Sequence, residues 1–139
     1  MKTWWVFALA SSFFAALTAI LAKIGIRNVD SDLATAIRTV VILLIAWGIV
    51  FYKGALGNIS SISKHSLIFI GLSGVATGLS WIFYFRALQL GKVSQVAPID
   101  KSSLAFTILL SVLFLGDSLS WKTALGGALI LAGSMVMIL

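Results

Sequence analysis

Long apolar stretches alternate with short polar segments along the whole chain. We predict helices at residues 4–22, 33–52, 66–90, 93–115 and 121–139, with polar connections at 23–32, 53–65, 91–92 and 116–120. Each stretch has about the 20 residues that an α-helix needs to cross the hydrocarbon core of a bilayer. Because few residues remain outside these stretches, the pattern predicts an all-α membrane protein with five transmembrane helices, organised as a single transmembrane domain over 1–139.

The first stretch, residues 4–22, has one alternative interpretation. Lys2 followed by an apolar run also occurs in cleaved signal peptides. The run is longer than the apolar region of a normal signal peptide, however, and no clear cleavage site precedes Lys23. We therefore favour a retained helix.

Composition agrees with a lipid environment and excludes several classes of protein. Of the 139 residues, 60% are hydrophobic and only 10% are charged, against about 25% charged in soluble domains. The chain has no cysteine and one histidine, His65, which leaves no disulfide framework and too little for a metal site. The net charge of +6 comes from scattered residues, not from a phosphate-binding stripe. We expect the lipid bilayer as a partner, and no nucleic acid, metal or cofactor.

The balance of basic residues bears on orientation in the membrane. An odd number of helices places the two termini on opposite sides. One side carries Lys2, Lys53, Lys64 and Lys122, and the other carries Lys23, Arg27, Arg86 and Lys92. Equal counts give the positive-inside rule no basis for choosing an orientation. Either the chain inserts both ways and pairs antiparallel with itself, or Arg38 and Lys101, inside predicted helices, place the second side in the cytoplasm.

Four charged residues fall inside predicted helices at similar depth, roughly 6–10 Å from the helix ends at about 1.5 Å per residue. They are Arg38, Arg86, Asp100 and Lys101. Neighbours on a continuous helix diverge by about 100°, so we expect Asp100 to pair with Arg38 or Arg86 and not with Lys101. Two interpretations stay open: an ion-pair network with cations reaching the interface, or a site for a substrate or a proton.

Polar and small residues form stripes on the third and fourth predicted helices. One hydroxyl stripe contains Ser73, Thr77, Ser80 and Tyr84, beside Trp81, and the other contains Asp100, Ser103, Thr107 and Ser111. Such stripes line polar pathways, but they also serve as ordinary packing between membrane helices. We expect close helix packing at Gly71, Gly74, Gly78, Gly126 and Gly133. Pro98 marks either a helix break that lines a cavity or the first turn of a helix that begins near Ala97.

Three segments carry a resemblance to a known family. The run from Gly74 to Lys101 includes Tyr84-Phe-Arg-Ala-Leu88, a short turn and Pro98, and it resembles the EamA-type domain of the drug/metabolite transporter superfamily. Phe114 to Trp121 resembles the turn between the family's last two helices, with Asp117 where Glu is common, and Gly126 to Gly133 resembles its last helix. The resemblance covers the chain as one five-helix repeat, whereas full-length members usually carry two repeats of opposite orientation.

This resemblance implies a membrane transporter of a small metabolite, and a lone repeat implies an antiparallel homodimer in the bacterial inner membrane. The substrate pathway would include Arg38, Trp81, Pro98, Asp100, Lys101 and the hydroxyl stripes. The related small multidrug resistance family uses a glutamate in its first helix. This chain has no glutamate, and Asp100 is the only acid within a predicted helix.

Other functions stay open at this point. No motif indicates an enzyme, because the chain has no nucleophile–base pair and no phosphate-binding loop. Two alternatives to a self-paired transporter are a non-transporting accessory subunit and half of a split transporter. The partner of the latter would be a homologous one-repeat chain.

Overall fold

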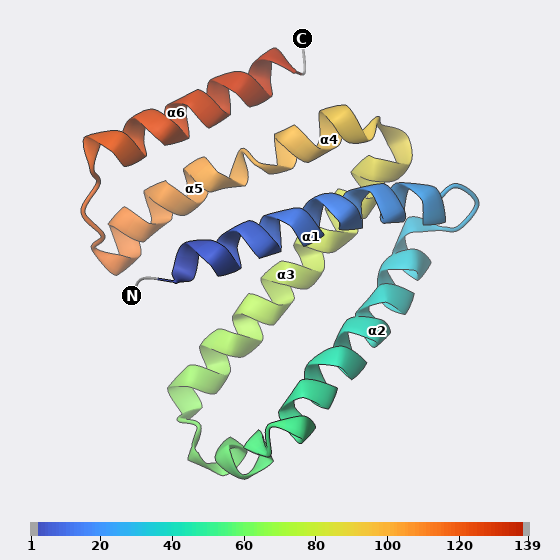
Figure 1. The fold of residues 1–139 in the computed structure, drawn as a ribbon, viewed down its shortest axis with the longest axis vertical. Helices are drawn as coiled ribbons and strands as arrows, with labels where there is room; N and C mark the ends of the chain where they lie inside the picture. The colour runs from blue at the N-terminus through green and yellow to red at the C-terminus, as the bar shows by residue number, and fades with distance from the viewer. Residues whose placement is uncertain (1–2, 138–139) are drawn as a thin grey trace. The chain divides into compact units, whose positions relative to one another are not determined.

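The structure is a computed structural model that describes residues 3–137, and its regular elements there are all helical (Figure 1). The elements are α1 (Trp4–Gly25), α2 (Ser31–Tyr52), the 3₁₀-helix η1 (Ala55–Ser61), α3 (Lys64–Leu90), α4 (Val93–Asp100), α5 (Ser103–Leu110), the π-helix η2 (Ser111–Leu115) and α6 (Trp121–Val136). The predicted all-α class is confirmed.

Four segments of the described chain are long and apolar enough to cross a membrane. They are α1, α2, α3 and the segment Val93–Leu115, while α6 is apolar but has only 16 residues. Large apolar side chains lie exposed along these helices, Phe83 at 72% and Leu44 at 68% among them. Lipid accounts for this exposure, since water would penalise it. The protein is therefore an all-α membrane protein; the predicted last helix reaches residues 138 and 139, which lie outside the described range.

Local sequence explains where α2 begins and ends. The Asp30 side chain accepts hydrogen bonds from the backbone N–H groups of Asp32 and Leu33, at 2.9 and 3.1 Å. This is the standard cap for the first, unpaired N–H groups of a helix. At the other end Gly54 takes a left-handed conformation, φ 63°, which ends the helix before η1.

The chain divides into two compact units. The first contains α1 up to Ile20 together with α4, α5, η2 and α6, and the second runs from Leu21 to Gln89. In the second unit α2 and α3 run in opposite directions, joined by the connection that contains η1 (Figure 1).

The core of the second unit lies where α1 ends, α2 begins and α3 ends. Phe85 and Leu88 of α3 and Ser31 of α2 are fully buried there. Lys23 donates a hydrogen bond to the carbonyl oxygen of Leu88, and the Gln89 side-chain amide donates to the carbonyl oxygen of Val29 at 3.0 Å. These two bonds connect the end of α1 and the α1–α2 turn to the last turn of α3.

In the first unit, α4 and α5 pack along α6. Gly127 of α6 is buried, and a Cβ added there would lie 2.9 Å from Cδ1 of Ile108 in α5. A side chain at this position would therefore require the Ile108 side chain to move. After η2, Gly116 adopts φ 69° and turns the chain toward α6.

Candidate functional site

Arg38 is the charged residue of α2 with the most distinctive surroundings. Its guanidinium carbon lies 4.0 Å from the centre of the Phe85 ring and 5.4 Å from that of Trp81, both on α3. One of its terminal nitrogens, Nη1, is buried and has no hydrogen-bond partner among the described residues. The side chain is thus held by aromatic faces and not by an acid.

Sequence reasoning named Arg38 and Trp81 but missed Phe85. The spacing of Trp81, Phe85 and Leu88 would have shown that all three lie on one face of α3. That face carries the two aromatic rings over which the Arg38 guanidinium lies.

The face of α2 that carries Arg38 is polar over two turns. Ser31 and Thr35, at seven and three residues before Arg38, are buried. The Thr35 hydroxyl donates to the carbonyl oxygen of Ser31 at 2.8 Å, whereas the Ser31 hydroxyl has no hydrogen-bond partner among the described residues. This polar face was not predicted, although the 31–35–38 spacing places the three residues together.

A cavity adjoins this face within the second unit. It has a volume of about 280 Å³ and is lined by the last turn of α1, the α1–α2 turn and the first turns of α2. Arg38 is the only charged residue in its lining, which is otherwise apolar and includes Gly25 and Ala34. The site can therefore accept an apolar group next to a cation.

The fourth predicted helix, expected to be continuous over 93–115, is interrupted near Asp100. Helix α4 contains Pro98 and ends two residues later, and α5 begins at Ser103. Across the interruption the backbone bonds connect residues three apart, from Ser102 N–H to the Ile99 carbonyl at 2.9 Å and from Leu104 N–H to the Lys101 carbonyl at 3.0 Å. Since Pro98 has no N–H to donate to the Ser94 carbonyl, the α-helical ladder also lacks a bond within α4, before the interruption.

The helix start expected near Ala97 is not observed, because α4 already begins at Val93. Of the two interpretations of Pro98, a proline inside the helix just before a break is therefore the one that the structure supports. Whether this break lines a pathway stays a prediction.

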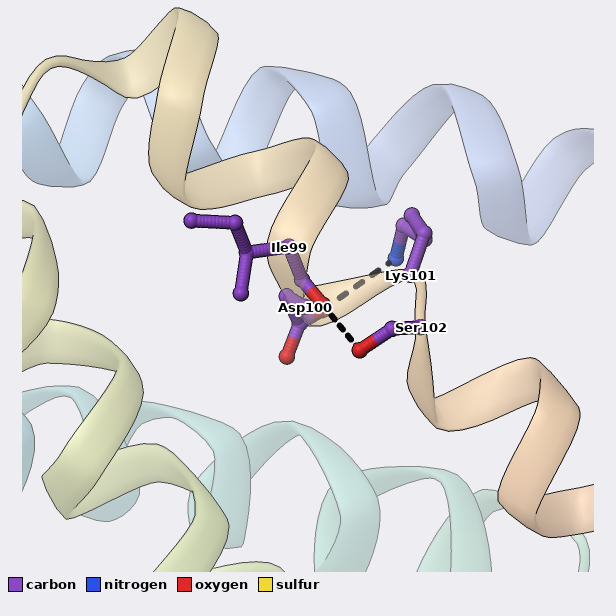
Figure 2. A network of polar contacts seen from close by, with 4 residues as sticks. All are labelled: Ile99, Asp100, Lys101 and Ser102. Atoms are coloured by element: carbon purple, nitrogen blue, oxygen red, sulfur yellow. Dashed lines mark hydrogen bonds and ion pairs between the residues drawn. The ribbon is translucent and has the colours of Figure 1, made fainter. Parts of the chain in front are cut away.

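The expected partners of Asp100 need correction. Its carboxylate lies 3.5 Å from Nζ of Lys101, the neighbour that the helical geometry seemed to exclude (Figure 2). Lys101, the residue that follows α4, keeps helical backbone angles, so the length of its side chain, and not a change in backbone direction, brings Nζ to the carboxylate. Figure 2 also shows the Ser102 hydroxyl donating to the Ile99 carbonyl, at 2.6 Å. Arg38 and Arg86 belong to the other compact unit, so the pairing of Asp100 with either of them stays a prediction.

The two hydroxyl stripes are partly engaged by their own helices. Thr77 donates to the carbonyl oxygen of Ser73, and Thr107 donates to that of Ser103, both at 2.9 Å. The stripes belong to different units, so their convergence on one pathway stays a prediction, as do the roles of Ser80, Tyr84 and Ser111. Tyr84 is half-buried, and its ring contacts Phe85 edge to face at 5.7 Å.

The five glycines expected in helix packing have open surroundings. A Cβ added to Gly71, Gly74, Gly78, Gly126 or Gly133 meets no atom within 4 Å. Their packing role stays a prediction. Gly127, which was not on that list, has the close contact with Ile108 described above.

Residues 2–139 match the EamA-like transporter family. The chain belongs to this family. A curated relative from Sinorhizobium sp., named an uncharacterized transporter in the cobO 3' region, is 46% identical over 136 residues, which cover 98% of this chain and 96% of the relative. No solved structure matches the chain.

For an EamA-like transporter, the half-buried Arg38 and the broken α4–α5 segment are the features that need a functional explanation. Charged side chains inside a membrane segment are costly and face protein interiors or polar cavities. Interrupted helices in transporters occur where the backbone is shielded from lipid or lines a cavity. Family membership points to transport and not to enzymatic chemistry.

Proposed function

We propose that this chain carries a small metabolite across the bacterial inner membrane and works as an antiparallel homodimer. The observation that supports the proposal is the length of the match. One match to the family accounts for residues 2–139 of this chain, and the aligned region covers 96% of a relative that is itself named a transporter. In the proposed assembly the second repeat of larger transporters is replaced by a second copy.

The charge pattern is compatible with such a pair. Transporters built from inverted repeats place the substrate between two halves of opposite orientation, near the middle of the bilayer. A single repeat reaches that arrangement only by pairing with an inverted partner. The equal distribution of Lys and Arg between the two sets of loops removes the usual obstacle to insertion in both orientations.

Within each copy we assign separate roles to the predicted residues. Arg38, Asp100 and Lys101 set the charge preference of the pathway. The hydroxyls and Trp81 supply polar and aromatic surface along it. Gly74, Gly78 and Pro98 allow the helices to shift as the site opens alternately to each side. The break after Asp100 supports the role of Pro98, because discontinuous helices in transporters surround the substrate.

Transport by the purified chain alone tests the proposal. Proteoliposomes containing only this protein should accumulate a labelled metabolite from a broad panel, and empty liposomes should not. Inactivity across the panel, with protein correctly folded, would favour a non-transporting accessory subunit. Activity that appears only when a second one-repeat protein is added would favour half of a split transporter.

Orientation can be tested separately, because the chain has no cysteine. Asn58 is exposed in η1, so Asn58→Cys provides a single label site in the α2–α3 connection. In intact cells a membrane-impermeant maleimide should label about half of the molecules if insertion is dual. Complete labelling or complete protection would contradict the antiparallel pair but not transport itself.

A further inference from the structure

We infer that Arg38 and the adjoining 280 Å³ cavity bind an organic monoanion that carries a compact apolar group. As an assignment of substrate class, this inference rests on the proposed transport function. As an assignment of a binding site, it rests on the surroundings of Arg38 alone.

The charge of Arg38 is not balanced by a described acid. No carboxylate of the described residues lies within ion-pair distance of Arg38, and its Nη1 atom is buried without a hydrogen-bond partner. A buried donor without a partner is costly, and more so when it carries charge. Arg38 also lines the cavity, where an anionic oxygen of a ligand would compensate the charge of the guanidinium.

The guanidinium of Arg38 lies over two aromatic rings. The ring of Phe85 lies 4.0 Å from the guanidinium carbon, with Trp81 at 5.4 Å. A guanidinium stacked on aromatic rings keeps its N–H groups at the edge of its plane, where they can form two parallel hydrogen bonds with a carboxylate. Lysine could not provide this paired recognition.

The cavity beside Arg38 suits a small apolar group. Its lining is apolar apart from Arg38, so it favours a hydrocarbon or aromatic group over a sugar or a peptide. Its volume is close to the lower end of the range of about 300–1,000 Å³ typical of small-molecule sites. One cation matches a single negative charge, and it opposes the binding of amines.

Two sources could supply this chemistry: a free organic acid, or the phosphate and acyl chain of an anionic lipid. Phenylacetate represents the first source. Phosphatidylglycerol, compared with phosphatidylcholine in nanodiscs, represents the second. Both are tested with the full-length protein.

Two variants and one control address the site. Arg38→Gln removes the charge, and Gly25→Leu fills the cavity from α1; a Cβ at Gly25 meets no atom within 4 Å, so the added side chain enters open space. Arg86→Gln is the matched control, because Arg86 is an exposed arginine of the same unit.

Phenylacetate binding is measured by titration calorimetry with protein in phosphatidylcholine nanodiscs, with phenethylamine as the ligand of similar shape and opposite charge. We expect Arg38→Gln and Gly25→Leu to weaken phenylacetate binding by about tenfold or more, since a charge-assisted hydrogen bond and the apolar contact are lost. Arg86→Gln should leave the affinity within about twofold of wild type, and phenethylamine should bind at least about tenfold more weakly.

A lipid ligand gives a different result that still supports the site. In that case phosphatidylglycerol raises the melting temperature of wild type but not of the two site variants, and it blocks phenylacetate. If neither anion binds, or if binding persists in Arg38→Gln, the inference is overturned. Transport of another solute by Arg38→Gln at the wild-type rate would overturn the assignment of the substrate class, while leaving the proposed function intact.

Discussion

Arg38 and Asp100 occupy equivalent places in their helices, seven residues after Ser31 and seven after Val93. Their surroundings are nevertheless different. Arg38 lies on a continuous 22-residue helix, against two aromatic rings and without an acidic partner among the described residues. Asp100 lies at the end of an eight-residue helix, where Lys101 approaches its carboxylate to 3.5 Å.

The difference shows how two membrane segments accommodate charge. On α2 the helix stays intact and the cation is placed against α3, so the charge is satisfied by neighbours far away in sequence. On α4 the helix ends, and the charge is neutralised by the next residue along the chain. The Asp100 and Lys101 side chains stay 36% and 54% exposed, so this pair has access to its surroundings. Of the two residues, only Arg38 has no charged partner among the described residues.

The largest expected effect is on transport through Arg38. Arg38→Gln should lower uptake of an anionic substrate by about tenfold or more, because a charge-assisted hydrogen bond contributes about 1.5–3 kcal/mol. Arg86→Gln, which removes an exposed charge of the same unit, should retain most activity. Initial uptake rates in proteoliposomes provide the measurement. Equal losses in the two variants would mean that overall charge, and not the site, is responsible.

Pro98→Ala should have the next largest effect. Alanine restores the missing N–H and favours the helix interior by about 3 kcal/mol over proline. The amides of α4 should become more protected against hydrogen exchange, because the Ser94 carbonyl gains a donor, and uptake should fall several-fold as α4 becomes stiffer. Gln95→Ala, at an exposed position of the same helix, is the control. Unchanged exchange would show that Pro98 does not weaken α4.

The contact between Arg38 and Phe85 should contribute a moderate stabilisation. A double-mutant cycle with Arg38→Gln and Phe85→Leu should give a coupling of about 0.5–2 kcal/mol, the range for cation–π contacts. Unfolding of the purified protein in detergent provides the free energies. Phe83→Leu, at an exposed ring two residues away, should show no coupling to Arg38. A similar coupling for both phenylalanines would refute the specific contact.

The smallest effect is expected for the Asp100–Lys101 pair. Since both side chains are at least one-third exposed, a cycle with Asp100→Asn and Lys101→Gln should give a coupling of no more than about 1 kcal/mol. The coupling should also decrease with added salt. A larger coupling that does not change with salt would show that the Asp100–Lys101 pair is shielded from solvent, which would contradict the difference drawn between Asp100 and Arg38.

Much of this architecture follows from local sequence. Apolar length predicted the spans, and a helix break was one of the two interpretations of Pro98. The expectation that Asp100 would not pair with Lys101 was wrong, because a long lysine side chain can reach across the 100° between neighbouring positions. Phe85 was missed because its contact with Arg38 depends on the register of α2 against α3, which periodicity within a single helix does not contain.

The central claim is that two copies of this one-repeat chain transport together, with Arg38 required in each. Co-reconstitution of wild type with Arg38→Gln in equal amounts tests it most directly, after each protein has been assayed alone at the same density. If the functional unit is a pair and only the wild-type pair is active, random pairing predicts about one quarter of the wild-type uptake rate. A rate of about one half would contradict the account, because each chain would then act independently of the other.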